Sequence, residues 1–212
     1  NTTLEYVTEN TDIAYIAVPT PSGENGECDT SIIEEILSQL PDGYIAVIKS
    51  TVIPGTTSKL QSLFPNLKLA FSPEFLVERN RIEDFSNQKV LIVGTEHNDV
   101  AELVFEHHRQ AGVLSTNQTF QISSTEAEMV KYAQNTMLAS RVAIANMIFD
   151  ACDSKGINYD IIKEIAFDSF EVLGPHMVKV PGPDGRRGFG GKCLIRATRC
   201  KTRQNWSRSG YL

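Results

Sequence analysis

The stretch Ser123–Gly156, which reads SSTEAEMVKYAQNTMLASRVAIANMIFDACDSKG, decides how this chain is organised. Its first residues, Ser123 to Glu126, form a helix start signal with an acid in the first turn. About thirty residues then follow without Gly or Pro up to Gly156, which predicts a helix roughly 45 Å long. Apolar residues cover more than one face of this helix, a pattern typical of a helix that packs on several partners or across a dimer.

The residues before this helix alternate short apolar runs with helical patterns. We expect buried strands at 12–18, 44–49, 67–71 and 89–93, and helices at 30–39, 56–64 and 98–111, the last closed by Gly112. Such alternation predicts a parallel sheet covered by helices on both faces. The expected fold class is α/β: a partial Rossmann-like parallel sheet, followed by an all-helical domain with one long central helix.

Polar residues stand at the expected carboxyl ends of the strands, where ligands of such sheets bind. Thr20, Thr51 and Glu74 each come just after an expected strand, which agrees with a nucleotide crevice. Two simpler interpretations stay open. The threonines are equally suited to be turn hydroxyls, and Glu74 and Glu78 are equally suited to start a helix after Pro73.

The long helix carries a second candidate group. Lys131 and Asn135 are four residues apart and share a helix face. They form either a solvated edge with an extended lysine, or a pair of donors aimed at developing negative charge. Cys152 is interpreted as helix core. His97, His107 and His108 are expected to be exposed on their helix, and His176 to lie in a surface loop.

Beyond a second expected helix at 158–167, the run at 180–192, VPGPDGRRGFGGK, leads into Cys193. Glycine lets the backbone come close to a bound molecule, and the basic residues beside Cys193 favour the reactive thiolate. The alternative is a flexible turn that ends in an inert cysteine.

Composition narrows the class of protein. The chain is 41% hydrophobic and 22% charged, as in ordinary soluble globular proteins. It contains no run of eighteen apolar residues, so no membrane span is expected. The four cysteines have neither zinc nor disulfide spacing, which favours a reducing cytoplasm and no metal site. The net charge of −6 hides an asymmetry, because 194–212 holds five basic residues and no acid, which leaves 15 basic and 26 acidic residues, a balance of −11, in 1–193. Such an acidic body disfavours a nucleic-acid role.

Five stretches, in order along the chain, resemble the UDP-glucose/GDP-mannose dehydrogenase family. They are VPTP at 18–21, KSTVIPGT at 49–56, SPEFLVE at 72–78, EMVKYAQN at 128–135 with Leu138-Ala139, and GFGGKCL at 188–194. The resemblance implies the C-terminal part of an NAD-binding domain at 1–118 and a helical dimerisation domain at 119–194 that ends in the catalytic cysteine loop. It stops within two residues of Cys193, so 195–212 is expected to be a shifted reading frame or cloning scar, with a basic interaction arm as the alternative.

The resemblance also assigns an activity, a cofactor and roles. It implies NAD-dependent oxidation of UDP-glucose to UDP-glucuronate in two steps through a cysteine thiohemiacetal and thioester, in a homodimer formed through the long helix. Cys193 would be the nucleophile, Lys131 and Asn135 the oxyanion donors that also touch substrate, and Glu74 the group that handles the proton or water. The residues that would contact the cofactor are Thr20, Thr51 and Glu78, and Thr51 would also help to position water. The residues that would bind the sugar nucleotide are Phe75, Leu76, Val77 and Gly190.

Departures from the family pattern lead us to expect a fragment. A dinucleotide-binding fold is expected to begin with a strand, a Gly-x-Gly-x-x-Gly turn and a helix, and this chain contains no such segment. The family's C-terminal UDP-binding domain is also not recognisable in it. The family's acid four residues after the cysteine is Ala197 here. We therefore expect this chain alone to be inactive. Other functions left open are a non-catalytic dimerisation module, a dehydrogenase of GDP-mannose or another UDP-sugar, and a related hydroxyacid dehydrogenase.

Overall fold

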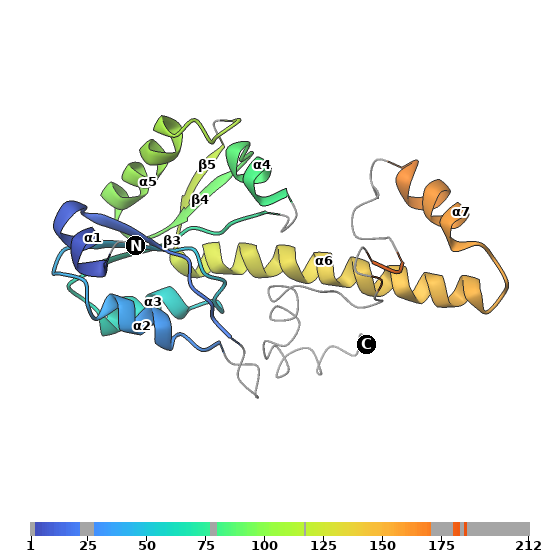
Figure 1. Cartoon of the computed structure of the whole chain (residues 1–212), viewed down its shortest axis with the longest axis horizontal. Coiled ribbons are helices and arrows are strands. Elements are labelled where there is room, and N and C mark those ends of the chain that lie inside the picture. Colours follow the sequence, from blue (N-terminus) through green and yellow to red (C-terminus); the bar gives the residue numbers. More distant parts are fainter. Residues whose placement is uncertain are drawn as a thin grey trace. The chain divides into compact units, whose positions relative to one another are not determined.

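The computed structural model describes residues 3–21, 28–76, 80–116, 118–170, 180–182 and 185 (Figure 1). The helices are α1 (Leu4–Asn10), α2 (Ser31–Leu37), α3 (Thr56–Leu63), α4 (Arg81–Ser86), α5 (Asn98–Gln110), α6 (Ser124–Asp153) and α7 (Tyr159–Lys163), which continues as a π-helical turn, Glu164–Asp168. The strands are β1 (Ile13–Ile16), β2 (Ile45–Ile48), β3 (Lys68–Phe71), β4 (Leu91–Gly94) and β5 (Thr119–Ile122).

The five strands form one mixed sheet in the order β1-β2-β3-β4-β5. Strands β1, β2 and β3 are parallel, as are β4 and β5. The junction departs from the all-parallel sheet expected from sequence, because β3 and β4 are antiparallel and share only the pair Phe71↔Gly94. The ligand-binding edge of a parallel sheet is therefore formed here by the carboxyl ends of β1, β2 and β3.

Alternating burial along the strands builds a core on each face of the sheet. Ala46 and Ile48 of β2 belong to one apolar cluster with Ile33 of α2 and Leu60 of α3. Val47, between them, belongs to a second cluster with residues of α5. Because successive side chains of a strand point to opposite faces, α2 and α3 cover one face and α5 the other (Figure 1). The α/β fold with covered faces is thus confirmed.

Three elements were missed by sequence reasoning. Helices α1 and α4 are only 7 and 6 residues long and bury no side chain completely. Strand β5 has no fully buried residue and extends the sheet beyond β4. Each lacks the long apolar periodicity that makes an element readable from sequence.

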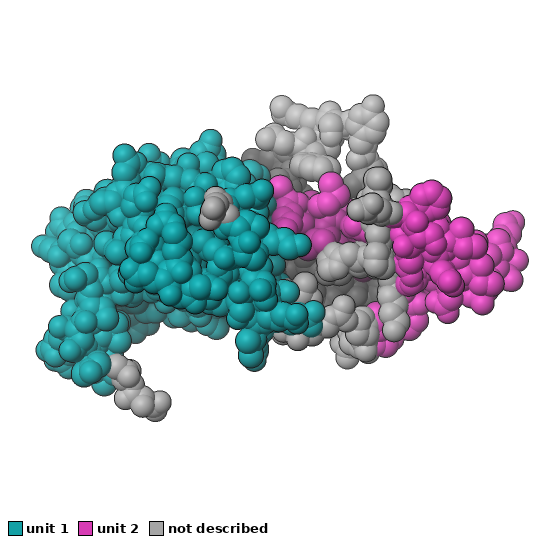
Figure 2. Space-filling model, turned by 90° about the horizontal axis from the view of Figure 1, so that it is seen from above, with its two compact units in different colours: residues 1–132 teal, residues 133–212 magenta. Residues whose placement is uncertain are grey.

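The chain divides into two compact units, residues 1–132 and 133–212, which are coloured separately in Figure 2. In the second unit, the last turns of α6 pack with α7 around Ala145, Cys152, Tyr159 and Val180. The rings of Phe149 and Tyr159 meet edge to face with centroids 5.4 Å apart, and Cys152 is core as expected. None of the helices in the described ranges combines the length and apolar character that a membrane crossing needs.

Candidate functional site

The segments that follow β1 and β2 are tied together by buried hydroxyl groups. Ser50 Oγ accepts a bond from the Val18 N–H at 2.9 Å and lies 2.7 Å from the Val18 carbonyl. Thr20, which is 2% exposed, donates its hydroxyl to the Thr51 carbonyl at 2.8 Å. Thr20 and Thr51 therefore lie beside each other after the carboxyl ends of β1 and β2, and hydrogen bonds join the two segments that carry them.

Glu74 lies in the irregular segment after β3, where two lysines hold it. Lys131 of α6 donates to the Glu74 backbone carbonyl, and its ammonium lies 5.5 Å from the centroid of the Phe75 ring. Lys49 approaches the Glu74 carboxylate, with Nζ 3.4 Å from Oε1. The described residues 72–76 are not helical, so the alternative of Glu74 as a helix-start acid is wrong. Two predicted site groups, Lys131 and Glu74, meet here.

Lys49 is a residue that sequence reasoning missed. It directly follows the apolar strand β2, and its side chain is only 7% exposed. Its ammonium also donates to Ser72 Oγ at 3.4 Å. Burial lowers the pKa of Lys49, and the nearby Glu74 charge acts in the opposite direction. The signal in the sequence was a lysine immediately after an apolar strand, at the edge where ligands bind.

Glu128 on α6 is a second missed residue. It is fully buried and accepts bonds from the Gly55 N–H at 2.6 Å, the Thr57 N–H at 2.8 Å and the Thr57 hydroxyl at 2.6 Å. Burial raises its pKa, while these bonds act against the rise. The carboxylate thus caps the N-terminus of α3, a favourable place for negative charge, and fixes the turn of α6 that carries Lys131.

Gly94 brings β4 against the first turn of α6. A Cβ at this position would lie 2.6 Å from Ala127 Cβ and 2.8 Å from Ser124 Cα. Only glycine permits this approach. The start of α6 is capped in addition by Ser123, whose Oγ accepts from the Glu126 N–H while the Glu126 carboxylate accepts from the Ser123 N–H, which confirms the predicted helix start.

Asn135 follows Lys131 by one turn of α6. Its residue is 3% exposed, and its Nδ2 finds no hydrogen-bond acceptor among the described residues. A buried amide donor without an acceptor is costly in a folded protein. The Asn135 amide is therefore suited to donate a hydrogen bond to a ligand oxygen, which is the role that the resemblance implied for it.

Part of the predicted site falls outside the described residues. This applies to Cys193 and Gly190 of the glycine-rich run, to Val77 and Glu78 after β3, and to His176. Phe75 and Leu76 are described and lie beside Glu74 in the irregular segment after β3.

A cavity of about 250 Å³ opens beside the segment that carries Thr51. Cys28 lines it, and its thiol lies 3.7 Å from the Thr51 carbonyl as a donor. The other lining residues are Thr30, Ile53, Pro54, Gly55, Thr56, Lys59 and Leu60. The lining of this cavity is mixed, because two threonine hydroxyls, the Cys28 thiol and the Lys59 ammonium stand beside apolar side chains. Within the described ranges, no cluster of His, Cys, Asp or Glu has the composition of a metal site.

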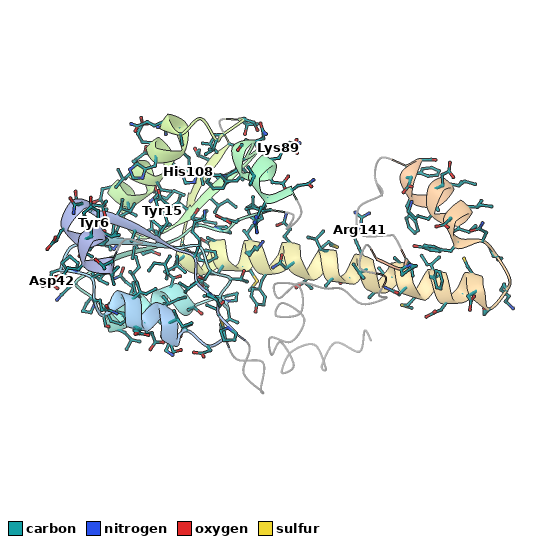
Figure 3. The ribbon with its side chains drawn as sticks, viewed as in Figure 1. Tyr6, Tyr15, Asp42, Lys89, His108 and Arg141 are labelled. Atoms are coloured by element: carbon teal, nitrogen blue, oxygen red, sulfur yellow. The ribbon has the colours of Figure 1, made fainter. Side chains whose placement is uncertain are left out.

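His108 is not exposed, contrary to the sequence expectation. It is 6% exposed, and its Nδ1 lies 2.8 Å from the Val104 carbonyl. The Tyr15 and Phe85 rings each lie with centroids 6.3 Å from its own, and Figure 3 labels Tyr15 and His108 between β1 and α5. Burial lowers the pKa of His108, and the bond to Val104 acts in the opposite direction. The imidazole therefore belongs to the core beneath α5.

Comparison with known proteins gives two family matches that together span most of the chain. Residues 1–112 match the NAD binding domain of the UDP-glucose/GDP-mannose dehydrogenase family, and residues 125–207 match the central domain of the same family.

Individual relatives agree with these matches. The UDP-glucose 6-dehydrogenase of Haloferax volcanii is 29% identical over 89% of this chain, and that of Rickettsia felis is 30% identical over 88%. The matched regions are 47% and 42% of those proteins, so the chain spans less than half the length of these relatives. A UDP-glucose dehydrogenase structure from Pyrobaculum islandicum superposes with a TM-score of 0.80 at 26% identity, over 98% of this chain and 49% of that one.

Proposed function

Because the chain belongs to the UDP-glucose/GDP-mannose dehydrogenase family, we propose that the complete gene product is an NAD-dependent dehydrogenase that oxidises UDP-glucose to UDP-glucuronate. The observation that carries the proposal is the convergence of the Lys131 ammonium, the Glu74 main chain and the Phe75 ring at the carboxyl edge of the sheet. The curated relatives named above support UDP-glucose as the substrate. Other nucleotide sugars are the alternative.

The first oxidation converts a primary alcohol into an aldehyde. The Glu74 carboxylate, 35% exposed beside Lys49, takes the hydroxyl proton directly or through water. NAD, when bound, accepts the hydride released in each of the two oxidations. Thr20, Thr51 and Glu78 are the residues proposed to hold it, and all three lie within the part of the chain, 1–112, that matches the family's NAD binding domain.

The second oxidation needs a nucleophile, because an aldehyde gives up hydride only after a group has added to its carbon. The Cys193 thiolate forms the new carbon–sulfur bond and leaves a negative charge on the former carbonyl oxygen. Lys131 and Asn135 stabilise that oxygen, and one such donor is worth about 3–4 kcal/mol in comparable sites. Loss of hydride then leaves a thioester.

Hydrolysis of the thioester completes the reaction. A water held by Thr51 and Glu74 gives one proton to the Glu74 carboxylate, which has released its earlier proton to solvent, as the water oxygen adds to the acyl carbon. The carbon–sulfur bond breaks, Cys193 returns to its thiolate, and the second proton passes to solvent as the new acid ionises. The products are a carboxylate and the free enzyme. The main-chain groups of Phe75, Leu76, Val77 and Gly190 are proposed to hold the sugar nucleotide during these steps.

Assembly into a homodimer through α6 is part of the proposal. Met137, Ile144 and Met147 expose 66%, 53% and 70% of their surface on this helix. Exposed apolar side chains gathered on one element are typical of an interaction surface. The competing function, a non-catalytic dimerisation module, uses the same side chains but requires no reactive thiol.

The test is NADH formation from UDP-glucose by the complete gene product. We expect two NADH per UDP-glucose and a UDP-glucuronate product. Cys193→Ala should stop the reaction before the acid is formed, whereas Cys152→Ala, which alters a buried helix residue, should leave the rate per folded molecule unchanged. A Cys193→Ala protein that still makes the acid at the unaltered rate would overturn the mechanism.

A dimer that forms no NADH from any nucleotide sugar, and whose Cys193 reacts with thiol reagents no faster than Cys28, would instead favour the module. Sedimentation and thiol labelling measure these two properties.

A further inference from the structure

The ion pair between Lys49 and Glu74 is unequal in its exposure to solvent. The Lys49 side chain is 7% exposed and that of Glu74 is 35% exposed, with 3.4 Å between Nζ and Oε1. The cation therefore lies behind the carboxylate, and the carboxylate forms the open side of the pair. This arrangement leaves the carboxylate accessible to a substrate hydroxyl or to water.

The backbone places both residues at the ligand edge. Ile48 and Phe71 are register partners at the carboxyl ends of the parallel strands β2 and β3. Lys49 comes directly after Ile48, and Glu74 comes three residues after Phe71. The Lys49 N–H is bonded to the Ile16 carbonyl at 2.8 Å, so its main chain is fixed by β1. The ammonium is thus carried by the rigid sheet, and the carboxylate by an irregular segment.

Two independent contacts then hold the Glu74 residue. Lys131 holds its backbone carbonyl, and Lys49 holds its side chain. The Ser72 hydroxyl, which accepts from the Lys49 ammonium at 3.4 Å, orients that ammonium from the same segment. Fixing only the main chain would leave the carboxylate free to rotate about its side-chain torsions. Among the residues that the structure describes, Lys49 is the one whose charged group approaches the carboxylate oxygens.

We propose that Lys49 is a positioning residue, which fixes the Glu74 carboxylate where it takes a proton from the substrate hydroxyl or from water. The inference rests on the proposed function, because it assigns Lys49 a role through Glu74. Lys49 itself exchanges no proton with substrate in this scheme. Misplacing a reacting group by about 1 Å can cost on the order of 100-fold in rate, which sets the size of the expected effect.

A kinetic double-mutant cycle in the complete gene product tests the proposal. The variants are Lys49→Met, Glu74→Gln and the double variant. We expect Lys49→Met to lower kcat about 100-fold with little change in the KM for UDP-glucose. In the Glu74→Gln background, the same substitution should have almost no further effect, because the group that Lys49 positions is already lost. Ammonium, which has the size of the single lost –NH3+ group, should restore part of the activity of Lys49→Met.

The matched control is Lys68→Met, which removes a lysine from the opposite end of β3. Lys68 also forms an ion pair, with Asp99 at 2.5 Å, but its side chain is 40% exposed. Its loss should leave kcat unchanged. If Lys49→Met does not fold, Lys49→Gln enters the same cycle, because its polar side chain can keep the bond to Ser72.

The outcomes separate the two proposals. Equal losses from the Lys49 substitution with and without Glu74 would overturn the positioning role and leave the role of Glu74 standing. An unchanged kcat in Glu74→Gln would overturn the role of Glu74, and with it the inference. A rise in KM without a fall in kcat would place Lys49 in substrate binding and also overturn the positioning role.

Discussion

The two halves of helix α6 are built for different surroundings. In the first unit, Ala127 and Glu128 are completely buried against β4 and the N-terminus of α3. In the second unit, Ala145 and Cys152 are buried, but Met137, Ile144 and Met147 are more than half exposed. The first half is therefore fixed by buried contacts within its own unit, although Met129 is 53% exposed there, whereas the second half leaves three large apolar side chains more than half exposed.

This difference bears on how Lys131 is held. Lys131 lies in the first half, one turn after Glu128 and Ala127. Its ammonium is thus oriented by a section of helix that the sheet unit already fixes. Asn135 lies in the part of α6 that belongs to the second unit, which begins at Ala133. Four substitutions, with their controls and one pH dependence, test the contrast below, from the largest expected effect on stability to the smallest.

Replacing Gly94 with valine should disturb the first half most. Its Cβ would meet Ala127 Cβ at 2.6 Å and Ser124 Cα at 2.8 Å, so α6 would have to move away from β4. We expect a loss of about 3 kcal/mol in unfolding free energy, measured by urea denaturation. Gly112→Ala is the control. Its site is open but has φ +66°, and it should cost about 1 kcal/mol. Equal losses would contradict the close-packing argument.

Glu128→Gln should come next, with a loss of about 2 kcal/mol. The new amide nitrogen would face a backbone or hydroxyl donor, so at least one of the three present bonds would be lost. Glu126→Gln is a control on an exposed acid of the same helix, whose replacement should cost much less. A loss in Glu126→Gln as large as that in Glu128→Gln would refute the special place of Glu128.

The difference in unfolding free energy between the natural protein and Glu128→Gln should depend on pH. Burial raises the pKa of Glu128 above its usual 4.5, so the folded chain binds this proton more tightly than the unfolded chain. Its contribution to stability is then complete below pH 4.5 and declines as the pH rises through the folded-state pKa. The stability advantage of the natural protein over Glu128→Gln should shrink over that range, as followed by denaturation at several pH values.

Cys152→Ser probes the small core of the second half. Serine keeps the shape but places a hydroxyl in the cluster around Tyr159, where Cys152 is 6% exposed. The expected loss is about 1 kcal/mol, again from urea denaturation. Cys28→Ser, at a half-buried site where the hydroxyl can still donate to the Thr51 carbonyl, should change stability less. The reverse order would argue against the Cys152 cluster as a packed core.

Met147→Gln should have the smallest effect on the dilute chain, within about 0.5 kcal/mol, because the side chain is 70% exposed. In a homodimer through α6, however, the same change should weaken association, as seen by sedimentation over a range of concentrations. A large loss of stability in dilute solution, with no change in association, would mean that this side chain packs within the chain.

The sequence predicted those parts of the fold that rest on strong local periodicity. The apolar runs at 44–49 and 67–71 contain β2 and β3, and the stretch free of Gly and Pro is α6. Strand β5 escaped because its residues, Thr119–Ile122, bury no side chain fully. The reversal between β3 and β4 escaped because strand direction depends on the path of the chain between strands, not on the pattern within them.

Residue type and position singled out Lys131 and Glu74 as candidates, and the structure brings the Lys131 ammonium to the Glu74 carbonyl, while their chemical roles stay predictions. Lys49 and Glu128 were not assigned because their partners come from distant segments. Glu128 is distinguished by the donors of α3, which lie about seventy positions earlier in the chain. His108 was assigned to the surface by residue type, but Tyr15 and Phe85 cover it. In each case a contact between distant elements decided the environment.

The single residue pair that joins β3 to β4 has a mechanical consequence. The sheet consists of a three-stranded ribbon, β1 to β3, and a two-stranded ribbon, β4 and β5, which are joined by the pair Phe71↔Gly94. The Thr95 hydroxyl adds a hydrogen bond to the Leu69 carbonyl at 2.9 Å. Each ribbon has four register pairs at every internal junction. Local opening of the sheet should therefore occur first at the junction between β3 and β4. Backbone amides next to this junction should exchange with heavy water before those inside either ribbon.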